Sequence, residues 1–421
     1  MADPFVAEVR VWGRRVGAVA EEEDGTVTFE YEPGFARSGF EISPFTLPLS
    51  LRSPVSFPEL TRIEAFQGLP GVLADALPDR FGKAVIARHF ADKGTPDAAL
   101  SPVQKLLYMG TGSLGALEFQ PALRFPLRKA EQEPLEIAAL VDQARTLVEG
   151  KTEGAIPEIM RIGASAGGAR PKAIILWNRE RNEMRSDFAV PHPGDEHWII
   201  KFDGVGELGA PDETPKPYNR IEYAYSLMAR SAGLDVPETR LFEERGFAHF
   251  LSRRFDRENG RRLHLHSLGG MQHADYNAPG HFSYEQYLRT VLALGLGYPA
   301  LEEAFRRTVF NITAVNQEDH VKNFAFLMDE TGSWRLAPAF DLTYARGLGF
   351  TRAHQMTLGG KSGRFVREDL LALGKTMGLR KAGAAILEDV TGALREWERF
   401  AHEAGVHANR VRFIASEFRL L

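Results

Sequence analysis

The order of strand-like and helix-like segments is the feature that most constrains the fold of this chain. Alternating apolar patterns typical of strands dominate the early part of the sequence. From about residue 283 onward the apolar spacing is almost wholly helical, at 283–294, 300–315, 366–377 and 380–405. This order predicts an α+β fold. Because 421 residues exceed the roughly 250–300 at which single cores stop growing, two or three subdomains are expected.

The first 125 residues are predicted to form a small α+β unit. Apolar residues alternate between glycines over the first 50 residues, which indicates a half-buried antiparallel sheet. A helix is expected near 71–93, and the glycine-rich segment 110–115 leads into a strand at Leu117. The polar stretch 126–134 marks a boundary, so the first domain is predicted to span 1–125.

The rest of the chain is predicted to divide into a β-rich unit, 126–255, and a helical unit, 256–421. Two apolar runs, 173–178 and 198–203, are separated by a charged, proline-containing stretch and predict a hairpin with a long, mobile loop. Further elements of the β-rich unit are helices at 137–150 and 219–232 and a strand at 247–251.

The composition disfavours several classes of protein. The formal net charge is −5 and acidic and basic residues are interspersed, so no basic face predicts direct nucleic-acid binding. The absence of cysteine excludes a disulfide framework and thiolate metal sites. The N-terminal residues have no apolar signal region, and no run is long enough to cross a bilayer. A cytoplasmic protein without a membrane partner is therefore expected.

A phosphate-binding loop is predicted at 163–172, with the sequence GASAGGARPK. Its glycines allow backbone N–H groups to approach phosphate oxygens without interference from a Cβ atom. The loop is not a Walker A sequence, and glycine-rich turns are common, so alone it is a weak signal.

Lys201 lies in the apolar strand HWIIKFD, 197–203, downstream of that loop, where a strand lysine that binds phosphate is expected. Apolar neighbours on both sides of the pleat mean that its charge needs a partner. Glu222, on the next predicted helix, occupies the place of the helix glutamate that pairs with this lysine in kinases. The alternative is an ordinary helix-surface salt bridge, which contributes little.

The strongest local signal is NQEDHVKN at 316–323, followed by the apolar strand FAFLM. A carboxylate five residues before an asparagine is the spacing of a kinase catalytic loop, where the carboxylate orients the substrate hydroxyl and the asparagine holds Mg²⁺. Glu318 and Asn323 have this spacing, and Asp341 follows a second strand, where another metal ligand is expected. A hairpin between them would bring all three residues next to a triphosphate.

These segments resemble the HipA family, the kinase toxins of bacterial toxin–antitoxin modules. The resemblance covers nearly the whole chain and is carried by GVLADALPDRFG at 71–82, GSLGALEFQP at 112–121, SAGGARPKA at 165–173, IIKFD at 199–203, NRIEYAYSLMARSAGLDVPETRL at 219–241, RRFDR at 253–257, EDHVKNFAF at 318–326 and LAPAFDLTYA at 336–345. It implies a small N-terminal subdomain, a β-rich ATP-binding lobe and an all-helical C-terminal lobe.

The resemblance also implies roles for individual residues. Asn323 and Asp341 would hold Mg²⁺, and Ser165 would be the autophosphorylated serine whose modification ejects the loop and switches the kinase off. Residues 253–255, which include Arg253 and Phe255, would follow the strand that forms the hinge to adenine. The full set of implied nucleotide-binding residues is Gly163, Ser165, Ala166, Gly167, Gly168, Lys172, Lys201, Arg253, Phe255, His320 and Phe340.

The predicted function is therefore an ATP- and Mg²⁺-dependent serine/threonine protein kinase. Its catalytic residues would be Glu318, Lys201, Asn323 and Asp341. The resemblance implies a HipB-like antitoxin as partner and a translation component, such as an aminoacyl-tRNA synthetase, as protein substrate.

Glu318 departs from the family pattern, which usually has aspartate there and reads D-x-H-x-K/R-N. Glutamate adds a methylene, and misplacing a reactive group by about 1 Å can cost on the order of 100-fold in rate. Asp319 could substitute only if the backbone shifted by one residue. The alternative function is therefore a nucleotide-binding pseudokinase that acts by binding a partner. A small-molecule phosphotransferase shares the D-x-x-x-x-N spacing, but the N-terminal resemblance argues against it.

Overall fold

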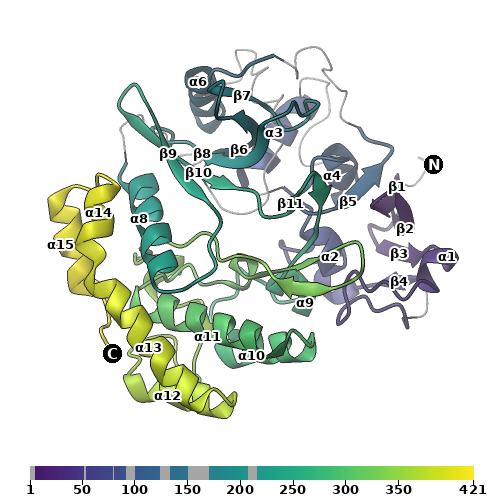
Figure 1. Ribbon diagram of the computed structural model, residues 1–421. Helices are drawn as coiled ribbons and strands as arrows, with labels where there is room; N and C mark the ends of the chain where they lie inside the picture. The colour runs from purple at the N-terminus through teal and green to yellow at the C-terminus, as the bar shows by residue number, and fades with distance from the viewer. Residues whose placement is uncertain are drawn as a thin grey trace.

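The computed structural model (Figure 1) describes residues 5–51, 54–78, 80–91, 100–123, 133–149, 170–206 and 216–421. Helices and sheets are both present, which confirms the predicted α+β class. In Figure 1 the N-terminal strands lie on one side of the molecule. The yellow helices α13 (Arg380–Arg395), α14 (Trp397–Glu403) and α15 (Ala408–Glu417) lie on the opposite side.

The N-terminal region forms a five-stranded sheet in the order β4-β3-β2-β1-β5. Its strands are β1 (Phe5–Val11), β2 (Arg14–Glu21), β3 (Val27–Tyr31), β4 (Val55–Ser56) and β5 (Leu117–Gln120). Alternate residues such as Val9, Val19 and Phe29 are fully buried, because successive side chains of a strand face opposite sides. The short elements α1 (Pro33–Ala36) and η1 (Pro58–Leu60) and the helix α4 (Pro102–Met109) complete this region.

The single helix predicted near 71–93 is two helices in the structure, α2 (Gly71–Ala74) and α3 (Arg80–Ala91). The chain turns between them around Pro78. Proline has no N–H to donate and disfavours the helical conformation of the residue before it, so one continuous helix cannot form across this position. Phe81 and Val85 of α3 pack into the core of the next region rather than into the N-terminal core.

The middle region forms a second five-stranded sheet in the order β7-β6-β8-β10-β9. Its strands are β6 (Lys172–Asn178), β7 (Glu183–Ser186), β8 (Asp195–Lys201), β9 (Thr239–Glu244) and β10 (Phe247–Arg253), with the helices α6 (Ile137–Val148) and α8 (Tyr218–Ser231). The predicted pairing of the two apolar runs is present as β6 and β8. The long loop expected between them is wrong, because β7 pairs with the other edge of β6.

The C-terminal region is mainly helical, with α9 (Leu268–Gln272), α10 (Tyr284–Ala293), α11 (Gly297–Thr313), α12 (Arg367–Thr376) and α13 to α15. The helix predicted at 380–405 is divided into α13 and α14. Its strands are β11 (Arg257–Glu258), β12 (Arg261–Arg262), β13 (His264–Ser267), β14 (Phe282–Ser283), β15 (Ala325–Met328), β16 (Trp334–Leu336) and β17 (Met356–Thr357). The predicted hairpin is formed by β15 and β16, and β13 pairs with the other edge of β15.

The N-terminal region docks onto α9 through a direct contact between the backbones of the two regions, with no side chain between them. A Cβ atom built on Gly71 would lie 2.1 Å from the carbonyl oxygen of Gly270, so only glycine fits there. Three histidines of the C-terminal region join this contact. His266 bonds Ser43 and Asp75, and His264 donates from Nε2 to the carbonyl of Ile42 at 2.8 Å. His273 accepts from the N–H of Gly71 at 3.0 Å.

The contact of His273 requires a neutral ring, because its Nε2 atom accepts a hydrogen bond, and the burial of His264 also favours the neutral ring there. Burial lowers the pKa of each to about 4, and the neighbouring His266 adds to the shift. His264 Nδ1 is buried without a hydrogen-bond partner among the described residues, and protonation of His273 Nε2 would remove its acceptor atom. Both rings therefore favour docking only in the uncharged form.

We predict that the protein loses stability as the pH falls from 6.5 towards 4. The unfolded histidines, with a pKa near 6.5, bind protons in this window while the folded ones do not, so the stabilisation present above pH 6.5 disappears. For the fully buried His264 the loss reaches on the order of 3 kcal/mol. Melting temperature measured against pH tests this. His264→Gln should flatten the profile, the exposed His402→Gln should not, and equal profiles for both variants would contradict the prediction.

Candidate functional site

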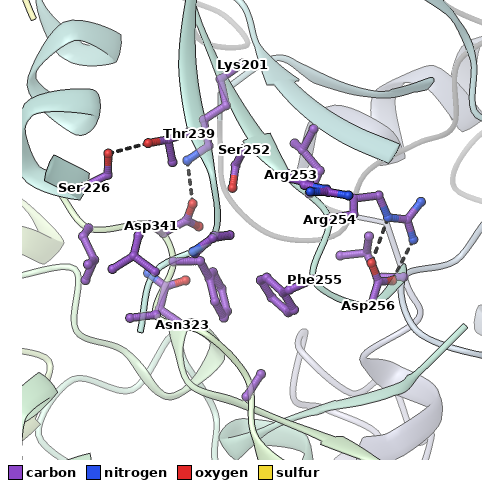
Figure 2. Close-up of a pocket in the computed structure, with 18 of the residues that line it drawn as sticks. Lys201, Ser226, Thr239, Ser252, Arg253, Arg254, Phe255, Asp256, Asn323 and Asp341 are labelled. Atoms are coloured by element: carbon purple, nitrogen blue, oxygen red, sulfur yellow. Dashed lines mark hydrogen bonds and ion pairs between the residues drawn. The ribbon is translucent and has the colours of Figure 1, made fainter. Parts of the chain in front are cut away.

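A cleft lies between the middle sheet and the C-terminal region (Figure 2). Its empty volume, including its open mouth, is about 1070 Å³. The predicted residues that the structure brings together along its wall are Lys172, Lys201, Arg253, Phe255, Asn323, Phe340 and Asp341. Glu318 lines a small adjoining cavity with Asn323 and Phe340, whereas His320 lines neither space.

Lys201, the last residue of β8, contacts two carboxylates. Its Nζ donates to Glu222 Oε1 and to Asp341 Oδ1, each at 2.5 Å. Burial disfavours the ammonium form, but the two carboxylates outweigh burial and raise the pKa of Lys201 above its usual value. Glu222 is buried on α8, so the ion pair lies inside the cleft and is not a helix-surface salt bridge.

Lys172 lies directly opposite Lys201 in the register of β6 and β8, and it is buried in the same wall. Like charges on directly opposite residues of neighbouring strands repel each other. Burial alone would raise the pKa of Asp341, but Lys201 and Lys172 lower it to about 2. Lys172 and Lys201 together balance the negative charges of Asp341 and Glu222 in this wall of the cleft.

Asp341 follows β16 in the left-handed backbone conformation, with φ at 53°. A non-glycine residue there costs on the order of 1–3 kcal/mol and persists only where surrounding contacts hold it. The bond to Lys201 is one such contact, and the N–H of Ala339 donates to the carbonyl of Asp235 nearby at 2.7 Å. The strained backbone turns the carboxylate of Asp341 towards the cleft, as Figure 2 shows.

Asn323 ends η3 (Val321–Asn323), the short turn between α11 and β15. Its Nδ2 donates to the backbone carbonyl of Glu318 at 2.9 Å, which fixes the amide and leaves Oδ1 as its acceptor atom. Burial lowers the pKa of His320, and its Nδ1 has no hydrogen-bond partner within the described part of the chain. The Glu318 side chain is exposed.

Asp319 is buried and faces away from solvent. Its Oδ1 accepts from the N–H of Gln355 at 2.7 Å, and its Oδ2 is bonded by the Tyr284 hydroxyl at 2.5 Å and by His354 Nδ1 at 2.7 Å. Both oxygens are therefore used within the protein. Of the two adjacent carboxylates, the one accessible from solvent is Glu318.

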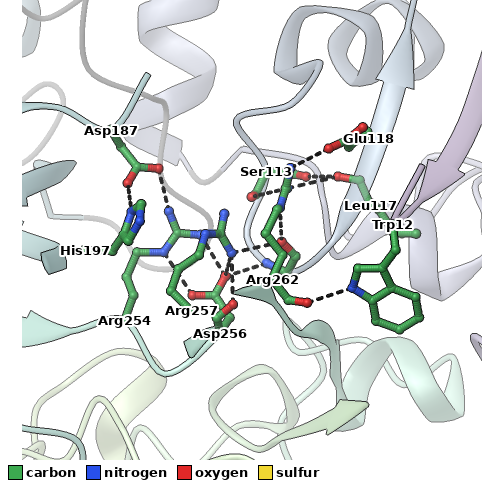
Figure 3. Close-up of polar contacts among 11 residues, drawn as sticks. Trp12, Ser113, Leu117, Glu118, Asp187, His197, Arg254, Asp256, Arg257 and Arg262 are labelled. Atoms are coloured by element: carbon green, nitrogen blue, oxygen red, sulfur yellow. Dashed lines mark hydrogen bonds and ion pairs between the residues drawn. The ribbon is translucent and has the colours of Figure 1, made fainter. Parts of the chain in front are cut away.

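Arg253 and Phe255 lie at the exit of β10, where the rings of Phe255 and Phe340 are 5.4 Å apart. Their sequence neighbours Arg254 and Asp256 belong to a buried polar cluster (Figure 3). Arg254 donates twice to Asp256, at 2.9 and 2.7 Å, and once to Asp187 at 2.8 Å. The N–H of Gly115, from the N-terminal region, donates to Asp256 at 2.6 Å. This cluster links the N-terminal region to the edge of the cleft.

The cleft also contains residues that were not anticipated from the sequence, among them Asp75 and Ser267. Asp75, at the end of α2, accepts from the N–H and the hydroxyl of Ser267 at 2.7 and 2.6 Å. Its position as a lone carboxylate within the apolar stretch Val72–Leu77 was the available signal.

The predicted loop residues Gly163, Ser165, Ala166, Gly167 and Gly168 lie outside the described residues.

Within the described ranges, no three histidine, aspartate or glutamate side chains come together as a ready metal site. A cation in the cleft would therefore depend on ligands beyond such a cluster. Over the same ranges, no helix has the length and apolar character needed to cross a bilayer.

Comparisons with known proteins match both parts of the chain. The model of the HipA-like C-terminal domain matches residues 164–418, and the model of the HipA N-terminal domain matches residues 7–120. A Sinorhizobium fredii protein named "Putative kinase Y4dM" is 23% identical over 80% of this chain and 76% of its own length. A second protein of that organism, named "Putative kinase Y4mE", is 24% identical over 80% of this chain and 77% of its own length.

The fold matches a chain of a solved structure, that of the Shewanella oneidensis MR-1 toxin–antitoxin system of HipA and HipB with operator DNA. The TM-score is 0.66, the match covers 97% of this chain and 94% of the other, and 16% of the residues are identical. At this identity the likeness concerns the fold alone.

The polar cluster at the cleft edge generates a stability prediction. Asp256→Asn should lower the free energy of unfolding by roughly 3–5 kcal/mol, because Arg254 and Arg257 would lose a buried charged partner. The remaining bond from Arg254 to Asp187 places the effect towards the lower end. Urea titration measures it. Glu258→Gln removes a half-exposed partner of Arg335 and should cost less than about 1 kcal/mol. A similar small effect at Asp256 would contradict the prediction.

Proposed function

Because the chain belongs to the HipA-like family, we propose that it is an ATP- and Mg²⁺-dependent serine/threonine protein kinase. The observation that carries the proposal is the contact of Lys201 with both Glu222 and Asp341 inside a cleft also lined by Asn323. A strand lysine paired with a helix glutamate, next to a metal-binding aspartate and asparagine, is the arrangement that kinases use for phosphoryl transfer.

The residues of the cleft fit the chemistry of Mg-ATP. Lys201 and Lys172 supply positive charge for phosphate oxygens, together with the loop at 163–172, and Arg253 and Phe255 would border the adenine. The Asp341 carboxylate and the Asn323 amide oxygen are hard oxygen ligands of the type that Mg²⁺ prefers, with substrate phosphates completing the coordination. Mg²⁺ bound there would neutralise charge on the phosphates.

Glu318 would orient the acceptor hydroxyl. It is exposed, it begins the segment that ends in Asn323, and its backbone carbonyl holds the Asn323 amide. Its extra methylene also supports the second candidate, a nucleotide-binding pseudokinase that acts through partner binding.

Membership of the family supports proposals for the regulation and the partners of the protein. We propose that Ser165 is autophosphorylated, which would place negative charge beside the phosphate site and weaken nucleotide binding. A HipB-like antitoxin is proposed as partner, and a translation component such as an aminoacyl-tRNA synthetase as substrate, in the cytoplasm. The proposed domains are 1–125, 126–255 and 256–421, the last carrying Asn323 and Asp341.

Mg-ATP should raise the melting temperature of the protein. A ligand that binds only the native state stabilises it by about 2.7 kcal/mol at a concentration 100 times its dissociation constant. Asp341→Asn should remove the Mg²⁺-dependent part of the shift. Asp329→Asn, at the turn between β15 and β16, is a matched control that should retain it. No shift in the wild-type protein at millimolar Mg-ATP would refute the proposal.

Substitutions at 318 and 319 should have different effects. Glu318→Gln should remove phosphate transfer from labelled ATP and leave the melting temperature unchanged, because this exposed carboxylate has no structural bond through its side chain among the described residues. Asp319→Asn should lower the melting temperature, because an amide nitrogen would face the donors that now bond its buried oxygens.

If the wild-type protein binds Mg-ATP but transfers no phosphate to itself or to any lysate protein, the pseudokinase is the correct assignment. If Glu318→Gln transfers phosphate at the wild-type rate, Glu318 has no role in orienting the acceptor.

A further inference from the structure

The segment between Asp341 and Glu368 has an unusual charge balance. Over residues 342–367, here called the basic segment, the chain contains no aspartate or glutamate, and its basic residues are Arg346, Arg352, Lys361, Arg364 and Arg367. The chain as a whole has a formal net charge of −5, so this local excess of positive charge departs from the average. An excess of one sign on a surface attracts a partner of the other sign.

The basic segment also exposes large apolar side chains. Leu348 is 100% exposed and Phe350 is 62% exposed. The turn that carries them is closed by hydrogen bonds from the N–H of Gly347 to the carbonyl of Thr351 and from the N–H of Arg352 to the carbonyl of Gly349, both at 3.1 Å. A closed turn therefore holds both side chains in water, where an apolar side chain contributes no burial energy unless a partner covers it.

Both ends of this turn are attached to the loop that carries Glu318. On one side, the N–H of Gln317 donates to the carbonyl of Ala345 at 3.0 Å. On the other side, Gln355 donates from its N–H to Asp319 at 2.7 Å and from its side chain to the carbonyl of Phe350. The attachment points are the immediate neighbours of Glu318 in sequence. A molecule that binds the turn is thereby brought to Glu318.

Part of the positive charge is neutralised within the protein, and part is not. Arg346 pairs with Glu417, Lys361 pairs with Asp369, and Arg367 pairs with Glu388. Arg352 and Arg364 are exposed and form no ion pair with any described residue. They are the charges available to a bound partner.

We propose that the basic segment is the docking surface for the protein substrate and selects an acceptor serine or threonine flanked by acidic residues and a large apolar residue. This inference rests on the proposed kinase function and adds a specificity to it. The acidic flank would pair with Arg352 and Arg364, and the apolar residue would cover Leu348 and Phe350. The apolar tip and its attachment beside Glu318 favour a peptide over a nucleic acid, whose phosphates would need only the arginines.

Binding of a labelled peptide tests the proposal without requiring catalysis. The probe is a fluorescein-labelled peptide with one serine, acidic residues on both sides and one leucine, and fluorescence anisotropy reports its dissociation constant. Leu348→Ser combined with Phe350→Ser should weaken binding about tenfold or more, as should Arg352→Glu combined with Arg364→Glu. The arginine variant should also lose most of the dependence on salt concentration, since exposed charges are screened by salt.

Matched variants elsewhere on the surface control for general effects. Leu292→Ser on α10 removes another exposed leucine, and Arg37→Glu after α1 reverses another exposed arginine. Both should bind the peptide with wild-type affinity. All variants should keep the wild-type thermal shift with Mg-ATP, because none of the changed residues lines the cleft. Absence of that shift in every protein, with peptide binding retained, would refute the kinase function and leave the docking surface standing.

The proposal is overturned if the wild-type protein does not bind the acidic peptide, or binds a lysine-flanked version equally well. It is also overturned if the variants leave peptide affinity unchanged. Loss of binding to single-stranded RNA or to vesicles containing 30% phosphatidylserine, with peptide binding unaffected, would reassign the surface to that partner.

Discussion

The structure of the cleft depends on the burial of one ammonium group between two carboxylates. Lys201 comes from β8, Glu222 from α8 and Asp341 from the segment after β16. Burying a charge without a partner costs free energy. The strand β8, the helix α8 and the segment after β16 must therefore pack together for these three charged side chains to be buried in the cleft. The triad has one more negative than positive charge, and the opposite lysine, Lys172, lowers the pKa of Asp341 further. A charge requirement of this kind restricts the geometry of the site more closely than apolar packing would.

A second buried network connects the N-terminal region to the same cleft. Asp256, next to Phe255, is shared by Arg254, Arg257 and the backbone of Gly115. Buried ion pairs contribute little net stability compared with apolar packing, but an unpaired member is strongly destabilising. The N-terminal region is thus required to complete the polar environment of the cleft edge. Its docking through Gly71 and His273 has the same character, since the first contact tolerates only glycine and the second only a neutral ring.

Glu318 and Asp319 illustrate how adjacent residues of the same charge acquire different environments. Asp319 is held by Tyr284, His354 and Gln355, and it thereby attaches the basic segment to the loop. Glu318 is left exposed beside that attachment. Asp319, which fixes the loop, is therefore the immediate neighbour of Glu318, which faces solvent. The basic segment, proposed to receive the substrate, is attached to the loop through Asp319.

The sequence by itself determined the α+β class, the order of the elements and the candidates for the cleft. Apolar periodicity and a fixed spacing of charged residues are local properties, which explains why Lys201, Asn323 and Asp341 could be named before their positions were known. Contacts across long separations in the sequence were not accessible in the same way. Whether Glu222 paired inside the cleft or on a helix surface, and which carboxylate of the pair 318 and 319 was exposed, depended on how α8, α10 and the basic segment packed. The strand β7 was also missed, because it is too short to show an alternating apolar pattern. The helix break at Pro78 was missed because the apolar residues on both sides of it suggested one continuous helix. Tertiary structure decided these points, since the free energy of a buried charge depends on every group around it and only the folded chain brings those groups together.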